Sequence, residues 1–152
     1  MPAPAAFREA ATLYWTSYQL APPASYGRLV GMLKASVLGG RGAEEAVLVR
    51  GVLPDGGSSP TACYASALAA LLAGDLPRAT TEAEAMRAGG DAFSRAADAI
   101  VAIAAHDSRA ARRAITAIEQ DFATRDAHLT GVAIADTAVL FATLLERIAP
   151  LP

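Results

Sequence analysis

The chain of 152 residues contains no asparagine, one lysine, one cysteine and two histidines. Its cysteine, Cys63, cannot form an internal disulfide, so the sequence does not require an oxidising compartment. His106 and His128 are far apart and neither is near the cysteine, which is not the clustered spacing of a metal site. Aromatic residues make up only 6% of the chain, and valine and isoleucine together number 14. Because these residue types favour strands, we expect no β-sheet.

Charged residues are also few and nearly balanced. They make up 18% of the chain, and 13 basic against 15 acidic side chains give a net charge of −2. This balance provides no basic surface, so we expect neither nucleic acid nor a membrane as a partner. No apolar run reaches the roughly 20 residues of a membrane-spanning helix. Residues 1–9 do not have the pattern of a signal peptide, and we expect a cytoplasmic protein.

Alanine is the residue that the chain has in excess, with 38 copies among 152 residues. Alanine has the highest helix propensity of the amino acids and is a poor strand former. The length fits one domain that is large enough to bury a core without disulfides. The sequence therefore predicts a single all-α domain over residues 1–152.

Prolines, glycines and capping residues divide the chain into about eight expected helices. These helices are expected at about 4–20, 26–38, 43–53, 60–74, 76–88, 92–105, 109–124 and from 130 or 136 to 150. The expected N-caps are Ser25, Ser59, Asp75, Asp91 and, for the last helix, Thr130 or Asp136.

An internal repeat recurs at intervals of about 33 residues. The fragment 74–79 (Gly-Asp-Leu-Pro-Arg-Ala) has a counterpart at 106–111 and a less similar one at 41–46. Each fragment ends in an alanine that follows a tight turn between two expected helices. A small residue there lets the axes of two helices approach closely. The repeat predicts a stack of about four antiparallel helical hairpins.

These fragments resemble the inter-helix turn of tetratricopeptide-type repeats, whose period is 34 residues. The resemblance covers about residues 27–124 and implies a protein-interaction module built from helical hairpins. Ala67, Ala70 and Ala83 stand where that family has large or aromatic residues, which favours an irregular helical bundle over a regular superhelix. The stretch 122–137 is also similar to the C-terminal part of all-helical actinobacterial proteins, a similarity that implies no function.

Aromatic side chains gather near the N-terminus. Five of the nine lie within the first 26 residues: Phe7, Tyr14, Trp15, Tyr18 and Tyr26. Large amphipathic rings on more than one side of a helix suggest that it buries two faces, one against the body and one against a second subunit or partner. The alternative is that the rings fill the open end of an alanine-rich core.

A possible polar site lies in the last third of the chain. Asp136 occurs in the most apolar stretch, with Asp126 and His128 a few residues earlier. As a buried carboxylate, Asp136 would act as an acid or a base. As an N-cap, it would only begin the last helix. We favour the cap.

The residues present favour a non-enzymatic, helical-repeat-like interaction module that self-associates through its N-terminal helix, with no cofactor. No residue is assigned a catalytic role, and Cys63 is expected as a small buried side chain. One alternative is a small-molecule-binding or enzymatic bundle that uses interior polar groups near Asp136 and His128. Another is a protein that neutralises a toxin.

Overall fold

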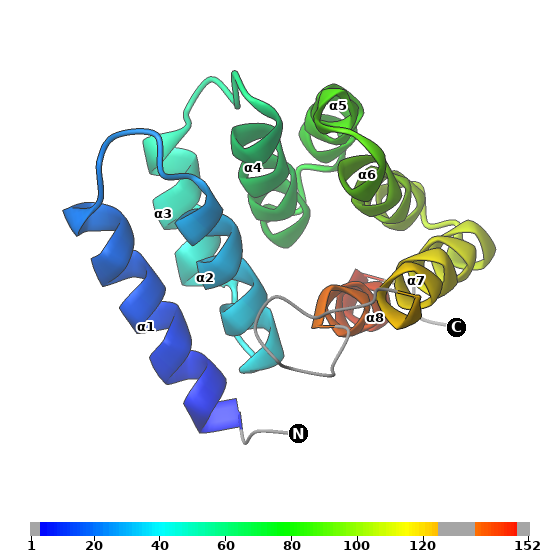
Figure 1. The fold of residues 1–152 in the computed structure, drawn as a ribbon, viewed down its shortest axis with the longest axis horizontal. Helices are drawn as coiled ribbons and strands as arrows, with labels where there is room; N and C mark the ends of the chain where they lie inside the picture. Colours follow the sequence, from blue (N-terminus) through cyan, green and yellow to red (C-terminus); the bar gives the residue numbers. More distant parts are fainter. Residues whose placement is uncertain (1–3, 125–135, 149–152) are drawn as a thin grey trace.

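The computed structural model describes residues 4–124 and 136–148, and every regular element in these ranges is helical (Figure 1). The expected all-α fold is confirmed for this part of the chain. Its elements are α1 (Pro4–Leu20), α2 (Gly27–Leu38), α3 (Ala43–Val52), α4 (Pro60–Ala73), α5 (Leu76–Met86), the short 3-10 helix η1 (Arg87–Gly89), α6 (Asp91–Ala104), α7 (Ser108–Ala123) and α8 (Asp136–Ile148).

The even-numbered helices form the core of the molecule. Helix α2 contacts α4, α4 contacts α6, α6 contacts α8, and α8 returns to α2, so the hairpins close into a ring (Figure 1). The odd-numbered helices pack outside this ring, and α1 contacts α2 alone among the described helices. Of the largest fully buried side chains, all but Met86 belong to even-numbered helices. The inner helices therefore contribute most of the apolar burial that stabilises the fold.

Polar contacts hold α8 against α2 at both ends of α8. Near its start, Lys34 Nζ donates a hydrogen bond to Thr137 Oγ1 at 2.8 Å. Near its end, Arg147 donates to the carbonyl oxygens of Val37 and Arg41 at 2.8 and 2.7 Å. These carbonyls lie at and just beyond the end of α2, where a cation is favoured by the helix dipole. These contacts attach both ends of α8 to the second half of α2 and the residues just after it.

The sequence repeat corresponds to a repeated turn between helices. After α2, α4 and α6 the chain bends through one residue with positive φ, namely Gly40, Gly74 and His106. In each turn one N–H bonds to the carbonyl three residues earlier and the following N–H to the carbonyl five residues earlier. This pair of bonds is the Schellman motif, which satisfies carbonyls at a helix end. Three successive connections therefore share one geometry.

The three repeated alanines lie where the odd-numbered helices begin. Ala46, Ala79 and Ala111 are each the fourth residue of their helix, and each is at most 1% exposed. A larger side chain at these positions would separate the helices of the hairpin, because interiors are close-packed. The burial of the three alanines therefore agrees with the close approach of helices that the sequence predicts at these positions.

Three expected N-caps, Ser25, Asp91 and Asp136, are wrong by one residue. Ser25 does not cap α2, because its Oγ donates to the carbonyl of Pro22 at 2.7 Å and the helix begins after Tyr26. Asp91 is the first residue of α6, which Gly90 precedes. Ser59 and Asp75 do cap their helices, accepting hydrogen bonds from the amides three residues on.

His106 provides a test of the repeated turn. It has a positive φ, and the equivalent residues of the other two turns, Gly40 and Gly74, are glycines. Its φ is +56° and its side chain is exposed, so the substitution His106→Gly relieves backbone strain and loses little packing. We expect the free energy of unfolding to rise by about 0.5–1 kcal/mol after allowing for the greater freedom of glycine in the unfolded chain. Gly74→Ala, at the equivalent position, should lower it by about 1 kcal/mol. Denaturant unfolding of both variants measures these changes, and a loss of stability in His106→Gly would contradict the assigned turn.

Candidate functional site

The N-terminal aromatic residues pack along α1 and the turn that follows it. Trp15 stacks on Tyr18 with ring centres 5.8 Å apart, and Tyr18 stacks on Tyr26 at 6.5 Å. Tyr14 covers the backbone of Gly31, where a Cβ atom would lie within 2.6 Å of the ring. Phe7 is half-buried. These rings hold α1 on α2. Of the five N-terminal aromatic side chains, only that of Tyr14 is exposed.

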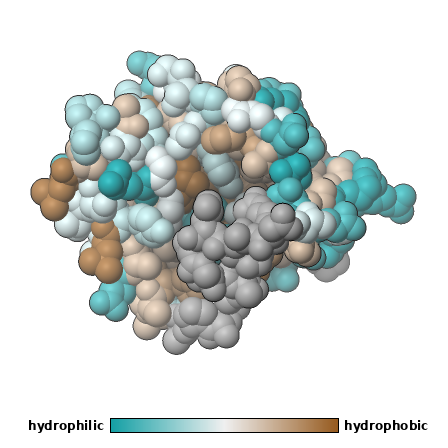
Figure 2. Space-filling model, in the orientation of Figure 1, coloured by the Kyte–Doolittle hydropathy of each residue, from teal (hydrophilic) through white to brown (hydrophobic). Residues whose placement is uncertain are grey.

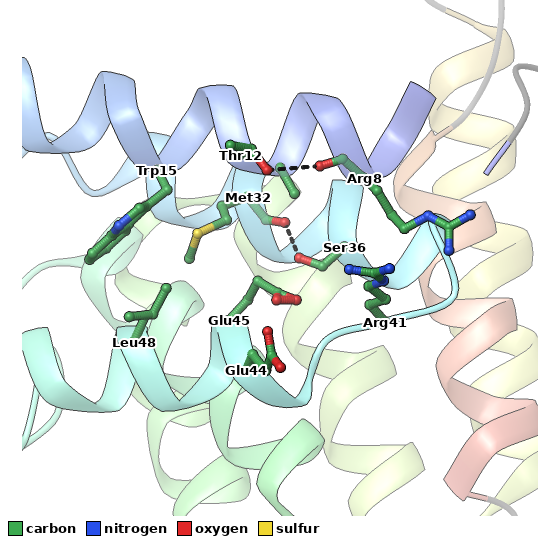
Figure 3. Close-up of a pocket in the computed structure, with 10 residues that line it drawn as sticks. Arg8, Thr12, Trp15, Met32, Ser36, Arg41, Glu44, Glu45 and Leu48 are labelled. Atoms are coloured by element: carbon green, nitrogen blue, oxygen red, sulfur yellow. Dashed lines mark hydrogen bonds between the residues drawn. The ribbon is translucent and has the colours of Figure 1, made fainter. Parts of the chain in front are cut away.

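A groove of about 210 Å³ lies between α1 and α3, with α2 as its floor (Figure 3). Trp15 and Leu48 form its apolar end, beside Met32. Arg8 and Arg41 lie together at the other end (Figure 3). The groove exists because α1 and α3 both pack on α2 while their backbones stay apart.

The groove contains charges of both signs that do not pair. Glu44 and Glu45 lie in the first turn of α3, where the helix dipole favours carboxylates. Neither is within 4 Å of the guanidinium groups of Arg8 or Arg41, since the described ion pairs all lie elsewhere. The groove therefore offers a cationic end, an anionic wall and an apolar end.

One side of α1 carries exposed apolar side chains. Leu13 and Leu20 are 64% and 82% exposed, and Figure 2 shows apolar side chains at the edge of the molecule where α1 lies. The alternating steps of four and three residues place them on one helical face with smaller side chains. We call the stripe of Ala6, Ala10, Leu13, Ser17 and Leu20 the α1 seam. Its exposed members are Ala6, Leu13 and Leu20, whereas Ala10 packs partly on the core and Ser17 Oγ accepts a hydrogen bond from Arg28 Nε of α2 at 2.7 Å. The aromatic residues of α1 do not indicate the seam, but the spacing of its residues by four and three positions is present in the sequence.

The residues expected near the second site are only partly described. Asp136 is exposed and is the first residue of α8, so its carboxylate is not buried in the core, and the helix starts one residue earlier than a cap at Asp136 would imply. Asp126 and His128 lie outside the described residues, as does Thr130. Within the described ranges, no three His, Cys, Asp or Glu side chains are grouped so that they could hold a metal ion.

Cys63 and Glu82 form a polar cluster under the loop before α4. Glu82 is 6% exposed; its Oε2 accepts from the amide of Gly57 at 3.1 Å, and its Oε1 lies 3.6 Å from a nitrogen of Arg78. Cys63 Sγ donates to the carbonyl of Gly57 at 3.3 Å. Burial, a hydrogen bond to Glu82 and the charge of Glu82 raise the pKa of the thiol to about 11. A nucleophilic cysteine needs a lowered pKa, so the raised pKa of Cys63 does not favour a nucleophilic role, and the contacts of the cluster fasten the loop.

Comparison with known proteins gives no match to a family model, to a curated protein or to a solved structure. Among the helices described, none is long and apolar enough to cross a membrane.

The reaction rate of the Cys63 thiol reports how strongly the cluster raises its pKa. With a pKa of about 11, the thiolate fraction at pH 8 is about one in a thousand, against about one in ten at the ordinary value of 9.0. We expect a disulfide reagent to modify the native protein at least ~100-fold more slowly than the unfolded chain.

Glu82→Gln removes a charge that raises this pKa, so it should speed the modification of the native protein. Arg87→Gln, which changes a charged group outside the cluster, serves as the control and should leave the rate unchanged. Equal rates for native and unfolded wild-type protein would contradict the described environment of Cys63.

Proposed function

We propose that the protein is a non-enzymatic interaction module that forms a homodimer through α1. The observation that carries this proposal is the α1 seam, an apolar face on a helix that has one described neighbour. Leaving Leu13 and Leu20 in water forfeits burial worth about 1.5 kcal/mol or more for each side chain. A second copy of the same helix would recover that burial.

The composition of the α1 seam suits an antiparallel pair of helices. A two-fold axis near the middle of α1 would place Leu13 of one protomer opposite the partner's Ala10, and Ala6 opposite the partner's Ser17. Leu13 of each protomer then meets a small side chain, which permits close packing. The seam itself contains no charged residue, and the charged groups beside it, Arg28 on Ser17 and Glu9 one turn before Leu13, would lie at the edge of this arrangement. Such an interface is isologous, the commonest symmetry of homodimers.

The groove between α1 and α3 stays open in this dimer, because it lies on a different side of α1 from the seam. It is lined by Arg8, Trp15, Arg41, Glu44 and Leu48, among others. Dimerisation would therefore present two copies of the groove. This supports a module that joins two partner chains more than one that only self-associates.

Sedimentation equilibrium of the purified chain tests the dimer. The chain has a mass of 15.5 kDa, and we expect about twice that mass at protein concentrations on the order of 100 µM. Leu13→Glu should weaken association by at least ~100-fold, because the change occurs twice in a symmetric dimer and each copy loses about 1.5 kcal/mol.

Gln19→Glu is the matched control. It adds the same charge to the same helix at an exposed position outside the seam, so the dimer should persist. A monomeric mass for the wild-type chain across the whole concentration range would overturn the proposal. Equal weakening by both variants would indicate a general effect of charge and would also count against the seam.

A further inference from the structure

A pocket of about 250 Å³ lies at one end of the inner ring. It is lined by residues near the starts of α4, α6 and α8 and from the first half or so of α2, with part of α7 beside them. Val30, Phe93 and Ile118 give it apolar walls. Lys34 and Tyr64 also line it, and neither belongs to the α1 seam or to the groove.

The hydroxyl of Tyr64 is buried and lacks a partner. Among the described side chains, its Oη is the one buried nitrogen or oxygen atom with no hydrogen bond. The ring is fixed edge-on against Phe93, with ring centres 6.2 Å apart. A buried hydroxyl without a partner is unfavourable by about 1–3 kcal/mol. Burial and the charge of Asp136 raise the pKa of Tyr64, so the group stays protonated and can donate.

Lys34 is the single lysine of the chain. Of the two cationic side chains that line this pocket, it is the one without an ion pair to a described carboxylate. Its Nζ donates to Thr137 Oγ1, which uses one of three N–H donors. Burial lowers the pKa of Lys34, and the charge of Asp136 opposes that effect. Arg95, the other cation in the pocket, is paired with Asp121 at 3.2 Å.

We infer that this pocket binds a small monocarboxylate with an apolar body. The carboxylate would accept hydrogen bonds from Lys34 Nζ and Tyr64 Oη, and the body would lie against Val30, Phe93 and Ile118. Lys34 and the Tyr64 hydroxyl offer donors for one carboxylate, and the nearby N-termini of α4 and α6 favour an anion, against the opposing charge of Asp136 at the start of α8. A cavity of about 150 Å³ holds benzene, so 250 Å³ holds roughly ten non-hydrogen atoms.

Calorimetric titration with 3-phenylpropionate tests the site, with 3-phenylpropan-1-ol as the matched neutral probe. We expect saturable binding of the acid in the millimolar range or tighter and at least ~30-fold weaker binding of the alcohol. Lys34→Met should weaken binding of the acid by at least ~30-fold. Equal affinity for the two probes, or no saturable binding of the acid, would overturn the inference.

Tyr64→Phe separates a binding role from a structural one. It removes only the unpartnered hydroxyl, so the free protein should be at least as stable as the wild type while the affinity for 3-phenylpropionate falls about 10-fold. Tyr18→Phe, at a tyrosine outside the pocket, should leave the affinity unchanged. If Lys34→Met does not fold, this pair of variants decides the question. Unchanged affinity in Tyr64→Phe would contradict the inferred site.

Discussion

The contact of α8 with α2 is the constraint on which the rest of the structure depends. It turns a row of helical hairpins into a closed ring and places Phe141, Leu140 and Leu144 of α8 in the shared interior. Lys34 and Arg147 make hydrogen bonds across this contact at the two ends of α8. The pocket beside Tyr64 lies where residues near the starts of α4, α6 and α8 meet α2.

Ring closure also decides which surfaces remain available. A helix in the ring has neighbours on several sides, whereas α1 lies outside it and contacts only α2 among the described helices. The groove and the α1 seam are the two remaining sides of that helix. Alanine makes the arrangement possible, since the fully buried Ala46, Ala79 and Ala111 allow each hairpin to close tightly. The alanine side chain has no reactive or hydrogen-bonding group, so binding by this chain depends on its few larger and polar side chains.

The fold could be read from the sequence because its determinants are local. Glycines, prolines and capping residues such as Ser59 and Asp75 mark the helix ends, and Gly74 and His106 mark the repeated turn. The pocket could not be found in this way. Lys34 and Thr137 are 103 residues apart, and a lone lysine in a helix is ordinarily a surface residue. The apolar neighbours of Asp136 in the sequence suggest a buried carboxylate, yet in the structure Asp136 is exposed.

The most direct test of the closed ring observes Lys34 itself. Because it is the only lysine, selective labelling with ¹³C-lysine gives a single set of side-chain NMR signals from the whole chain. A closed ring predicts a nuclear Overhauser contact between the Lys34 Hε protons and the Thr137 methyl group. It also predicts a pKa for Lys34 below its ordinary value of 10.5, because burial lowers it. A pKa at the ordinary value together with no contact to α8 would contradict the closure of the ring.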